Sequence, residues 1–279
     1  VCSECHTCVD VCPADAIHLD AQEEKVTADV GTVIVSTGFK LFPADAKPQY
    51  GYERYANVID GMQMDRLLAP TRPYNTVQRP SDGKVPDRIA YVMCTGSRDA
   101  TVGNPLCSRI CCMYSIKQNQ LIMGALPLAD ITVHNIDIRA VGKGYDPFFA
   151  QAAAMGTEFV KGRVARITET DEQNLILTYE DTENGGGKVE AEYDLVVLAV
   201  GVRPTAEPQK LFPAEVLALD EYLYVAEADE DLDPGRTSIP GVFVAGTASG
   251  AKDIPESILH AGSAIAQAAA YLERTEVPA

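Results

Sequence analysis

Eight cysteines are the residues of this chain whose type and spacing most clearly indicate chemistry, and they fall into two groups of four. The first group is Cys2, Cys5, Cys8 and Cys12, and the second is Cys94, Cys107, Cys111 and Cys112. In a reducing compartment, cysteines gathered in this way are more often metal ligands or redox groups than structural disulfides. The sequence therefore indicates two thiol-based sites.

The first group has the spacing C-x2-C-x2-C-x3-C, and Pro13 follows its last cysteine. This is the spacing of a bacterial-type ferredoxin loop, which holds a [4Fe-4S] cluster. Zinc is the alternative, although zinc sites usually pair two knuckles across a longer spacer. In two-cluster ferredoxins the fourth cysteine of such a run binds the other cluster. Cys12 therefore either completes the cluster of the first three cysteines or binds one whose other ligands precede Val1.

Three stretches each place a β-branched run in front of a glycine. They are "GTVIVSTGFKLFP" from Gly31, "DLVVLAVGVRPT" from Asp194 and "GVFVAGTASG" from Gly241. This pattern is typical of buried parallel strands whose C-terminal ends turn tightly beside a ligand. Three such strands in one chain favour a cofactor site at their ends.

A β-α-β unit lies between the first two of these stretches. We expect strands at 87–94 and 130–138, with a helix at 107–124 between them that Gly124 closes. The rest of this region is expected to form a helix at about 147–155 and strands at 158–170, 174–181 and 188–194. This order predicts a sheet domain inserted between two halves of another domain.

The segment "DIPESILHAGSAIAQAAAYLERT" is expected to form the C-terminal helix. Asp253 and Glu256 are predicted to form a capping box, and Pro255 falls in the first turn. The start of this helix is then aimed at the turn after Ala245. Its partial positive charge suits the electron-rich pyrimidine edge of a reduced flavin.

The three strands and the last helix resemble the flavin-binding frame of the thioredoxin-reductase and pyridine-nucleotide disulfide oxidoreductase family, over about residues 30–272. The resemblance implies an α/β flavoprotein with two dinucleotide-binding domains. Two features depart from it. Thr247 stands where the family has the aspartate that binds the ribityl chain, and a hydroxyl replaces only part of a carboxylate's hydrogen bonding. The G-x-G-x-x-G that holds the ADP half of FAD is absent.

The missing glycine motif and the missing initiator methionine predict that the sequence is the C-terminal portion of a longer polypeptide. We expect the chain to hold FAD weakly by itself, because the ADP-binding half is not in it. The domains are predicted as a ferredoxin-like [4Fe-4S] segment (1–29), part of an FAD domain (30–80), an inserted pyridine-nucleotide-domain-like module (81–193) and the FAD-domain return with the C-terminal helix (194–279).

A third departure from the family pattern indicates a more specific resemblance. Where the family's inserted domain has a glycine loop for NAD(P)H, this chain has "CTGSRDATVGNPLCSRICC", with the spacing C-x12-C-x3-C-C. Together with "YGYERYANVI", "RPSDGK", "IDIRAVGKGYD" and "GTASGAKDIPES", this loop is similar to the A subunits of heterodisulfide reductase and its relatives. The resemblance implies FAD flanked by [4Fe-4S] clusters, one on the first group of cysteines and a second on the later group.

Helix geometry limits how the later group could bind one cluster. Adjacent helical residues point about 100° apart, so Cys111 and Cys112 face one cluster only if the helix start is distorted. A junction between loop and helix permits that distortion, and Cys107 lies about one turn before Cys111. The first helical turn also offers free N–H groups to the cluster's sulfides. The alternative is a vicinal dithiol or a set of buried thiols.

The FAD contacts are predicted at the strand ends and at the start of the last helix. They are Thr37, Gly38, Gly201, Gly246, Thr247, Lys252, Asp253, Ile254, Pro255 and Glu256. No acid, base or nucleophile constellation stands out, so catalytic residues stay unassigned.

Composition excludes some functions. The net charge of -17 repels a nucleic-acid backbone. No run of apolar residues is long enough to predict a membrane span, and the first twenty residues do not have the pattern of a signal peptide, so a cytoplasmic location is expected.

The sequence is therefore interpreted as an electron-transfer subunit that contains FAD and one or two [4Fe-4S] clusters. By the resemblance, its partners are the iron-sulfur and substrate-reducing subunits of a heterodisulfide-reductase-like complex, and in that family the flavin can bifurcate electron pairs. The alternatives are an NAD(P)H-dependent disulfide reductase that uses Cys111 and Cys112 as its redox pair, and a zinc-stabilised structural subunit.

Overall fold

A computed structural model of the chain describes residues 5–183, 185–212 and 216–275, in two units, Val1–Gly31 and Thr32–Ala279. The first unit contains the short helix α1 (Thr7–Asp10), and none of its described residues is buried. A segment this short without a core needs a metal, disulfides or a partner to hold one structure.

All the strands found among the described residues belong to the second unit. They are β1 (Val33–Val35), β2 (Phe39–Leu41), β3 (Val58–Asp60), β4 (Arg88–Thr95), β5 (Asp130–Asn135), β6 (Glu158–Glu169), β7 (Leu175–Asp181), β8 (Lys188–Tyr193), β9 (Leu195–Val200), β10 (Val202–Pro204) and β11 (Val242–Val244). Its α-helices are α2 (Gly61–Leu68), α3 (Cys111–Ala125), α4 (Tyr145–Ala154), α5 (Glu207–Leu211) and α6 (Ile254–Thr275). Single 3-10 turns lie at Ala44–Ala46, Pro48–Tyr50, Ala100–Val102 and Gly246–Ser249.

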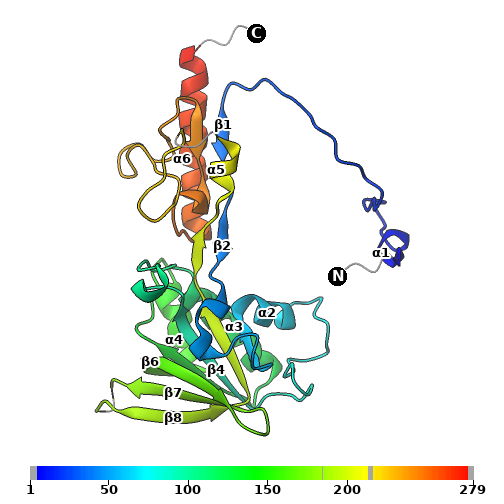
Figure 1. Cartoon of the computed structure of the whole chain (residues 1–279), viewed down its shortest axis with the longest axis vertical. Coiled ribbons are helices and arrows are strands. Elements are labelled where there is room, and N and C mark those ends of the chain that lie inside the picture. The colour runs from blue at the N-terminus through cyan, green and yellow to red at the C-terminus, as the bar shows by residue number, and fades with distance from the viewer. Residues whose placement is uncertain (1–4, 184, 213–215, 276–279) are drawn as a thin grey trace. The chain divides into compact units, whose positions relative to one another are not determined.

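Seven strands form the main sheet, in the order β3-β9-β4-β5-β6-β7-β8, and Figure 1 shows them in the part of the unit away from α6. The pairs from β3 to β6 are parallel, whereas β6, β7 and β8 pair antiparallel. β9 is buried along its whole length, as expected of a central parallel strand covered on both faces. β3 and β9 lie outside the module predicted at 81–193, yet they belong to its sheet.

The expected β-α-β unit is present with shifted boundaries, and its helix ends at Ala125, one residue after Gly124. The strand expected at 87–94 is β4, and the strand expected at 130–138 is the shorter β5. The helix expected from residue 107 begins only at Cys111. The reason is Arg109, whose φ of 63° lies in the left-handed region and cannot continue a right-handed helix.

The remaining strands form two small sheets. β1 pairs with β11 in parallel, with Val33 opposite Val242, and β2 pairs with β10 in antiparallel fashion. α6 packs on the first of these sheets, where Ala264 and Ala268 meet Phe243, so the small residues of the helix do allow close packing. Neither α6 nor any other helix in the described part of the chain is long and apolar enough to cross a membrane.

The turn after β4 depends on a glycine. Gly96 has a φ of +73°, and a Cβ there would collide with the buried ring of Phe42. We predict that Gly96→Ala destabilises the protein by about 2 to 5 kcal/mol, because it adds overpacking to backbone strain. Gly103→Ala is the matched control, since Gly103 has a φ of +70° and open space beside it. It should cost about 1 kcal/mol, and equal losses in thermal unfolding would contradict the packing argument.

Candidate functional site

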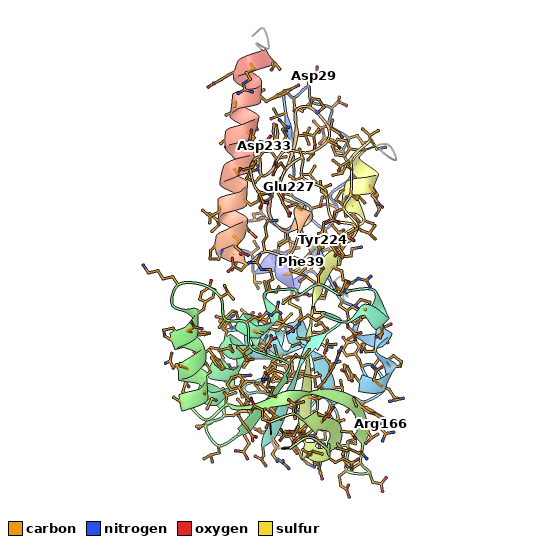
Figure 2. All side chains as sticks on the ribbon, turned by 90° about the vertical axis from the view of Figure 1, so that its left-hand side faces the viewer. Asp29, Phe39, Arg166, Tyr224, Glu227 and Asp233 are labelled. Atoms are coloured by element: carbon orange, nitrogen blue, oxygen red, sulfur yellow. The ribbon has the colours of Figure 1, made fainter. Side chains whose placement is uncertain are left out.

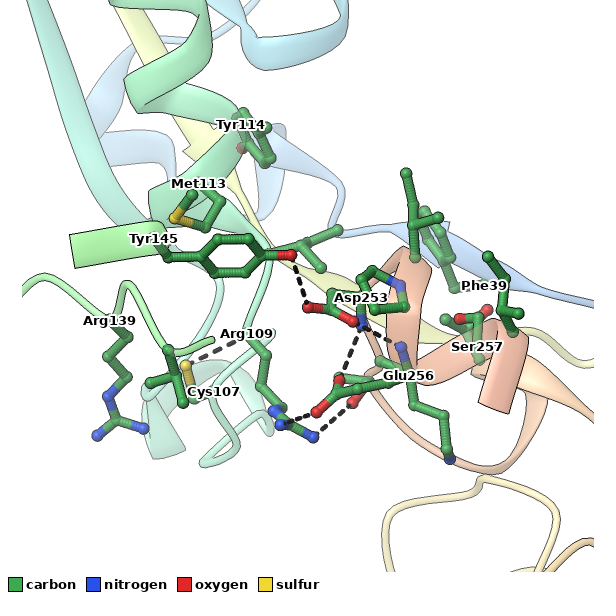
Figure 3. Close-up of a pocket in the computed structure, with 18 of the residues that line it drawn as sticks. Phe39, Cys107, Arg109, Met113, Tyr114, Arg139, Tyr145, Asp253, Glu256 and Ser257 are labelled. Atoms are coloured by element: carbon green, nitrogen blue, oxygen red, sulfur yellow. Dashed lines mark hydrogen bonds and ion pairs between the residues drawn. The ribbon is translucent and has the colours of Figure 1, made fainter. Parts of the chain in front are cut away.

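A pocket with a volume of about 1360 Å³ opens between the start of α6 and the first turns of α3 and α4. Figure 3 shows Tyr145 and Met113 on one wall and Asp253 and Glu256 on the other. Phe39 lies where the main-sheet part of the unit meets the part that carries α6 (Figure 2), and it also lines the pocket. The pocket is larger than most small-molecule sites, so a flavin ring system would fit within it.

The start of α6 has the predicted capping box. The Glu256 N–H donates to Asp253 Oδ1 at 2.8 Å, and the Asp253 N–H donates to Glu256 Oε2 at 3.0 Å. The hydroxyl of Tyr145 donates to the other Asp253 oxygen at 3.4 Å (Figure 3). The positive end of α6 therefore points into the pocket from a fixed turn.

The predicted FAD contacts divide into two sets. Those that line the pocket are Thr247, Lys252, Asp253, Ile254, Pro255 and Glu256. Those that do not line it are Thr37, Gly38, Gly201 and Gly246.

Two residues of the second set, Thr37 and Gly38, have surroundings that would suit a ligand. Thr37 Oγ1 is buried and finds no hydrogen-bond partner among the described residues, which is unusual for a buried hydroxyl. Gly38 has a φ of +71° and open space where a side chain would lie. A polar ligand atom beside this turn would satisfy the Thr37 hydroxyl.

The other two residues, Gly201 and Gly246, contact other residues of the chain. Gly201 is enclosed, since a Cβ there would collide with Ser97 and Ser108. The Gly246 N–H donates to Nδ1 of His260 at 3.0 Å. Gly201 therefore lies beside the loop of residues 96–110, which we call the cysteine loop, rather than at the large pocket.

The side chains of His260 and Glu227 hold the turn at Gly246. Nε2 of the buried His260 lies 3.0 Å from Glu227 Oε2, and because Nδ1 accepts from Gly246, Nε2 carries the proton that is donated. Burial opposes ionisation of Glu227, but the hydrogen bond from His260 and others lower its pKa to about 2. Lys252 donates to Ser249 Oγ at 2.8 Å, and burial lowers the pKa of this lysine. Sequence reasoning missed Glu227, because nothing local links it to His260.

The second group of cysteines comes together in the structure. All four, Cys94, Cys107, Cys111 and Cys112, line one small pocket beside the first turn of α3. In the described part of the chain, no three His, Cys, Asp or Glu side chains converge as a single metal ion requires. A cubane cluster makes a different demand, because each thiolate binds a different iron at a separate corner.

The electrostatics of this pocket suit an anionic cluster. Burial raises the pKa of Cys94 to about 11, and burial together with the neighbouring thiols raises the pKa of Cys111 well above its usual value. Buried thiols that oppose each other's ionisation need a cation to become thiolates. The charged residues that line the pocket are Arg98, Arg109, Arg139 and Asp137, and Arg98 and Arg139 partly offset the effect of burial on Cys94 and Cys112. The donor set therefore fits a [4Fe-4S] cluster, whose assignment stays a proposal.

Backbone N–H groups also point at these sulfurs. The Arg109 N–H donates to Cys107 Sγ and the Arg139 N–H donates to Cys112 Sγ, both at 3.4 Å. Such bonds stabilise thiolate ligands and tune cluster potentials. Cys107 lines the large pocket as well as the cysteine pocket, so the two sites share a wall.

The first group of cysteines is described only in part. Cys2 lies outside the described residues, while Cys5 and Cys8 are exposed. The Ala16 N–H donates to Cys12 Sγ at 3.4 Å, and this bond, with a second from Ala14, lowers the pKa of Cys12. The ligands of a cluster in this unit therefore stay a prediction.

Comparison with curated proteins gives relatives along almost the whole chain. The A subunit of the H(2):CoB-CoM heterodisulfide,ferredoxin reductase of Methanothermobacter thermautotrophicus is 39% identical over 99% of this chain and 42% of its own length. The iron-sulfur A subunit of the CoB–CoM heterodisulfide reductase of Methanocaldococcus jannaschii is 40% identical over 94% of this chain and 40% of its own length. The chain thus spans about two fifths of these relatives, and the predicted resemblance is confirmed.

Solved structures confirm the thioredoxin-reductase-like part of the predicted fold class, whereas the ferredoxin-like N-terminal segment stays a prediction. The thioredoxin reductases of T. acidophilum and Lactococcus lactis match with TM-scores of 0.53 and 0.54 at 16% and 15% identity. The matches cover 88% and 87% of this chain and 66% of each reductase. The family model of the pyridine nucleotide-disulphide oxidoreductases matches residues 5–268. The match of this family model along almost the whole chain shows that the chain belongs to the pyridine nucleotide-disulphide oxidoreductase family.

Proposed function

We propose that the chain is an electron-transfer subunit of a heterodisulfide-reductase-like complex. It would bind FAD in the large pocket and a [4Fe-4S] cluster on Cys94, Cys107, Cys111 and Cys112. The observation that carries this proposal is the place of Cys107 on the wall that the two pockets share. A cluster ligand on that wall would put the two redox groups in adjacent sites.

When bound, FAD would exchange electron pairs and the cluster single electrons. The chain's own residues have three tasks in the large pocket. The capped start of α6 places its positive end beside the bound ligand. Apolar side chains such as Met113 and Phe148 exclude water from the ring system. Tyr145 fixes Asp253, and so the turn that faces the ligand.

Onward transfer is proposed to use the first unit and the partner subunits. The curated relatives are named as A subunits of heterodisulfide reductases, so the partners proposed here are the iron-sulfur and substrate-reducing subunits of such a complex. The name of the Methanothermobacter relative gives two substances that are reduced, a heterodisulfide and ferredoxin. Splitting of electron pairs at the flavin between two such acceptors is part of the proposal.

The alternative of a dithiol reductase is disfavoured by the thiols themselves. A catalytic cysteine needs a thiolate, and such residues have lowered pKa values in partly exposed sites. Cys111 and Cys112 are both buried, and burial raises the pKa of each. These thiols are therefore poorly suited to attack a disulfide by themselves.

The test is to photoreduce the flavin by a light flash, with EDTA as the sacrificial electron donor, in the chain loaded with iron, sulfide and FAD, and to follow the cluster by its absorbance. We predict that electrons reach the cluster at a rate that does not depend on protein concentration, because both groups lie in one chain. Cys107→Ser should abolish this phase. A rate proportional to protein concentration would show transfer between molecules and would overturn the proposed pathway.

A further inference from the structure

The loop between Cys107 and Cys111 contains an unusual turn. Arg109 has a φ of 63°, and the Ile110 N–H donates to the Ser108 carbonyl at 2.7 Å across it. This is a γ-turn with positive φ, a rare and strained conformation for a residue other than glycine. The turn aims the Arg109 N–H at Cys107 Sγ and sends the Arg109 side chain in another direction. Such strain persists only where surrounding contacts hold it.

The Arg109 side chain reaches the start of α6, far away in the sequence. Its guanidinium forms an ion pair with Glu256, and its other terminal nitrogen donates to the Ala251 carbonyl at 3.5 Å (Figure 3). These two partners lie on either side of the turn from Lys252 to Pro255, which lines the large pocket. One residue thus contacts both the cysteine loop and the proposed flavin turn.

Stability does not explain this contact. The side chains of Arg109 and Glu256 are 49% and 34% exposed, and exposed ion pairs contribute little to folding. Glu256 also caps α6 with its other oxygen, which accepts from the Asp253 N–H. The Arg109 contact is therefore added to a turn that is already capped, at the cost of a strained backbone.

We propose that Arg109 is a positioning residue that ties the cysteine loop to the flavin turn and so sets the separation of the two redox groups. The predicted effect on electron transfer rests on the proposed function. The contact of Arg109 with the start of α6, which we call the tie, concerns only residues of this chain. If the tie is cut, the loop and the turn move independently, and electron transfer between the two sites slows because it depends steeply on distance.

The tie is tested first without cofactors, by hydrogen exchange of the backbone amides in residues 251–257. Arg109→Gln should raise their exchange by about tenfold, and Glu256→Gln, which keeps an oxygen for the helix cap, should raise it similarly. The double variant should exchange no faster than either single one. Arg236→Gln is the matched control, because Arg236 is 57% exposed and pairs with Asp233, and neither residue lines either pocket. Unchanged exchange in Arg109→Gln would overturn the tie.

The consequence is tested on the chain loaded with iron, sulfide and FAD. Arg109→Gln should keep its iron and flavin, and its flavin-to-cluster transfer should slow by about tenfold or more, whereas Arg109→Lys, which lacks the forked guanidinium, should recover part of the rate. An unchanged rate with faster exchange would overturn the positioning role and leave the proposed function standing. Absence of iron and flavin from the wild-type chain would instead refute the proposed function, while the exchange experiment still decides the tie.

Discussion

Replacing Cys111 or Cys112 by serine removes about four irons per chain and leaves the flavin pocket able to bind FAD. The expectation follows from the geometry of the second group. All four thiols line one pocket, and Arg98 and Arg139 offset part of the charge that the thiolates would carry. Serine has nearly the size of cysteine, so the buried first turn of α3 keeps its packing. Iron, flavin and thermal unfolding are measured on the same samples.

Cys8→Ser is the matched control, because Cys8 belongs to the other unit of the chain. It should affect only iron bound by that unit, so a Cys8→Ser and Cys111→Ser double variant should lose more iron than either single variant. Iron content that is unchanged in both Cys111→Ser and Cys112→Ser would contradict the assignment of the second cluster. Intact iron with a loss of titratable thiols would point to the dithiol reductase instead.

Neither NADH nor NADPH is expected to reduce the flavin directly, in contrast to the usual chemistry of this family. The turn after β4 offers no glycine-lined cradle for a pyrophosphate, because Gly96 is covered by Phe42 and cysteines occupy the helix start. Asp137 follows β5, near the position where nucleotide-binding domains have a ribose-binding acid. It pairs with Arg98 at 2.7 Å and with Arg139 at 3.3 Å, so its carboxylate is already engaged.

Stopped-flow mixing of the FAD-loaded chain with either nucleotide checks this prediction. The flavin absorbance should stay unchanged over the time in which dithionite reduces it fully, which is the positive control. Rapid bleaching by micromolar NADH or NADPH would contradict the prediction and would reopen the disulfide reductase alternative.

The fold was predictable where single segments carry the signal. β4 and β9 are short apolar runs bounded by turn residues, and such runs form buried parallel strands. The capping box at Asp253 and Glu256 was predictable for the same reason, since its residues lie three positions apart. The predicted start of α3 was wrong by one turn, because no residue type marks the γ-turn at Arg109.

The site was less predictable because its contacts join distant residues. Tyr145 meets Asp253 across 108 positions and Arg109 meets Glu256 across 147, and no spacing rule reaches so far. Glu227 and His260 are likewise isolated in sequence, yet they hold the turn at Gly246. Sequence reasoning therefore found the residues that share a motif and missed those that join two motifs.

The most direct test of the account is the content of iron, acid-labile sulfide, zinc and flavin in the anaerobically purified Cys8→Ser chain after incubation with FAD. In this variant the iron reports mainly on the second group of cysteines. The account predicts about four irons and four sulfides per chain, with FAD bound and zinc negligible. Zinc in place of iron, or a chain that holds neither iron nor flavin, would contradict it.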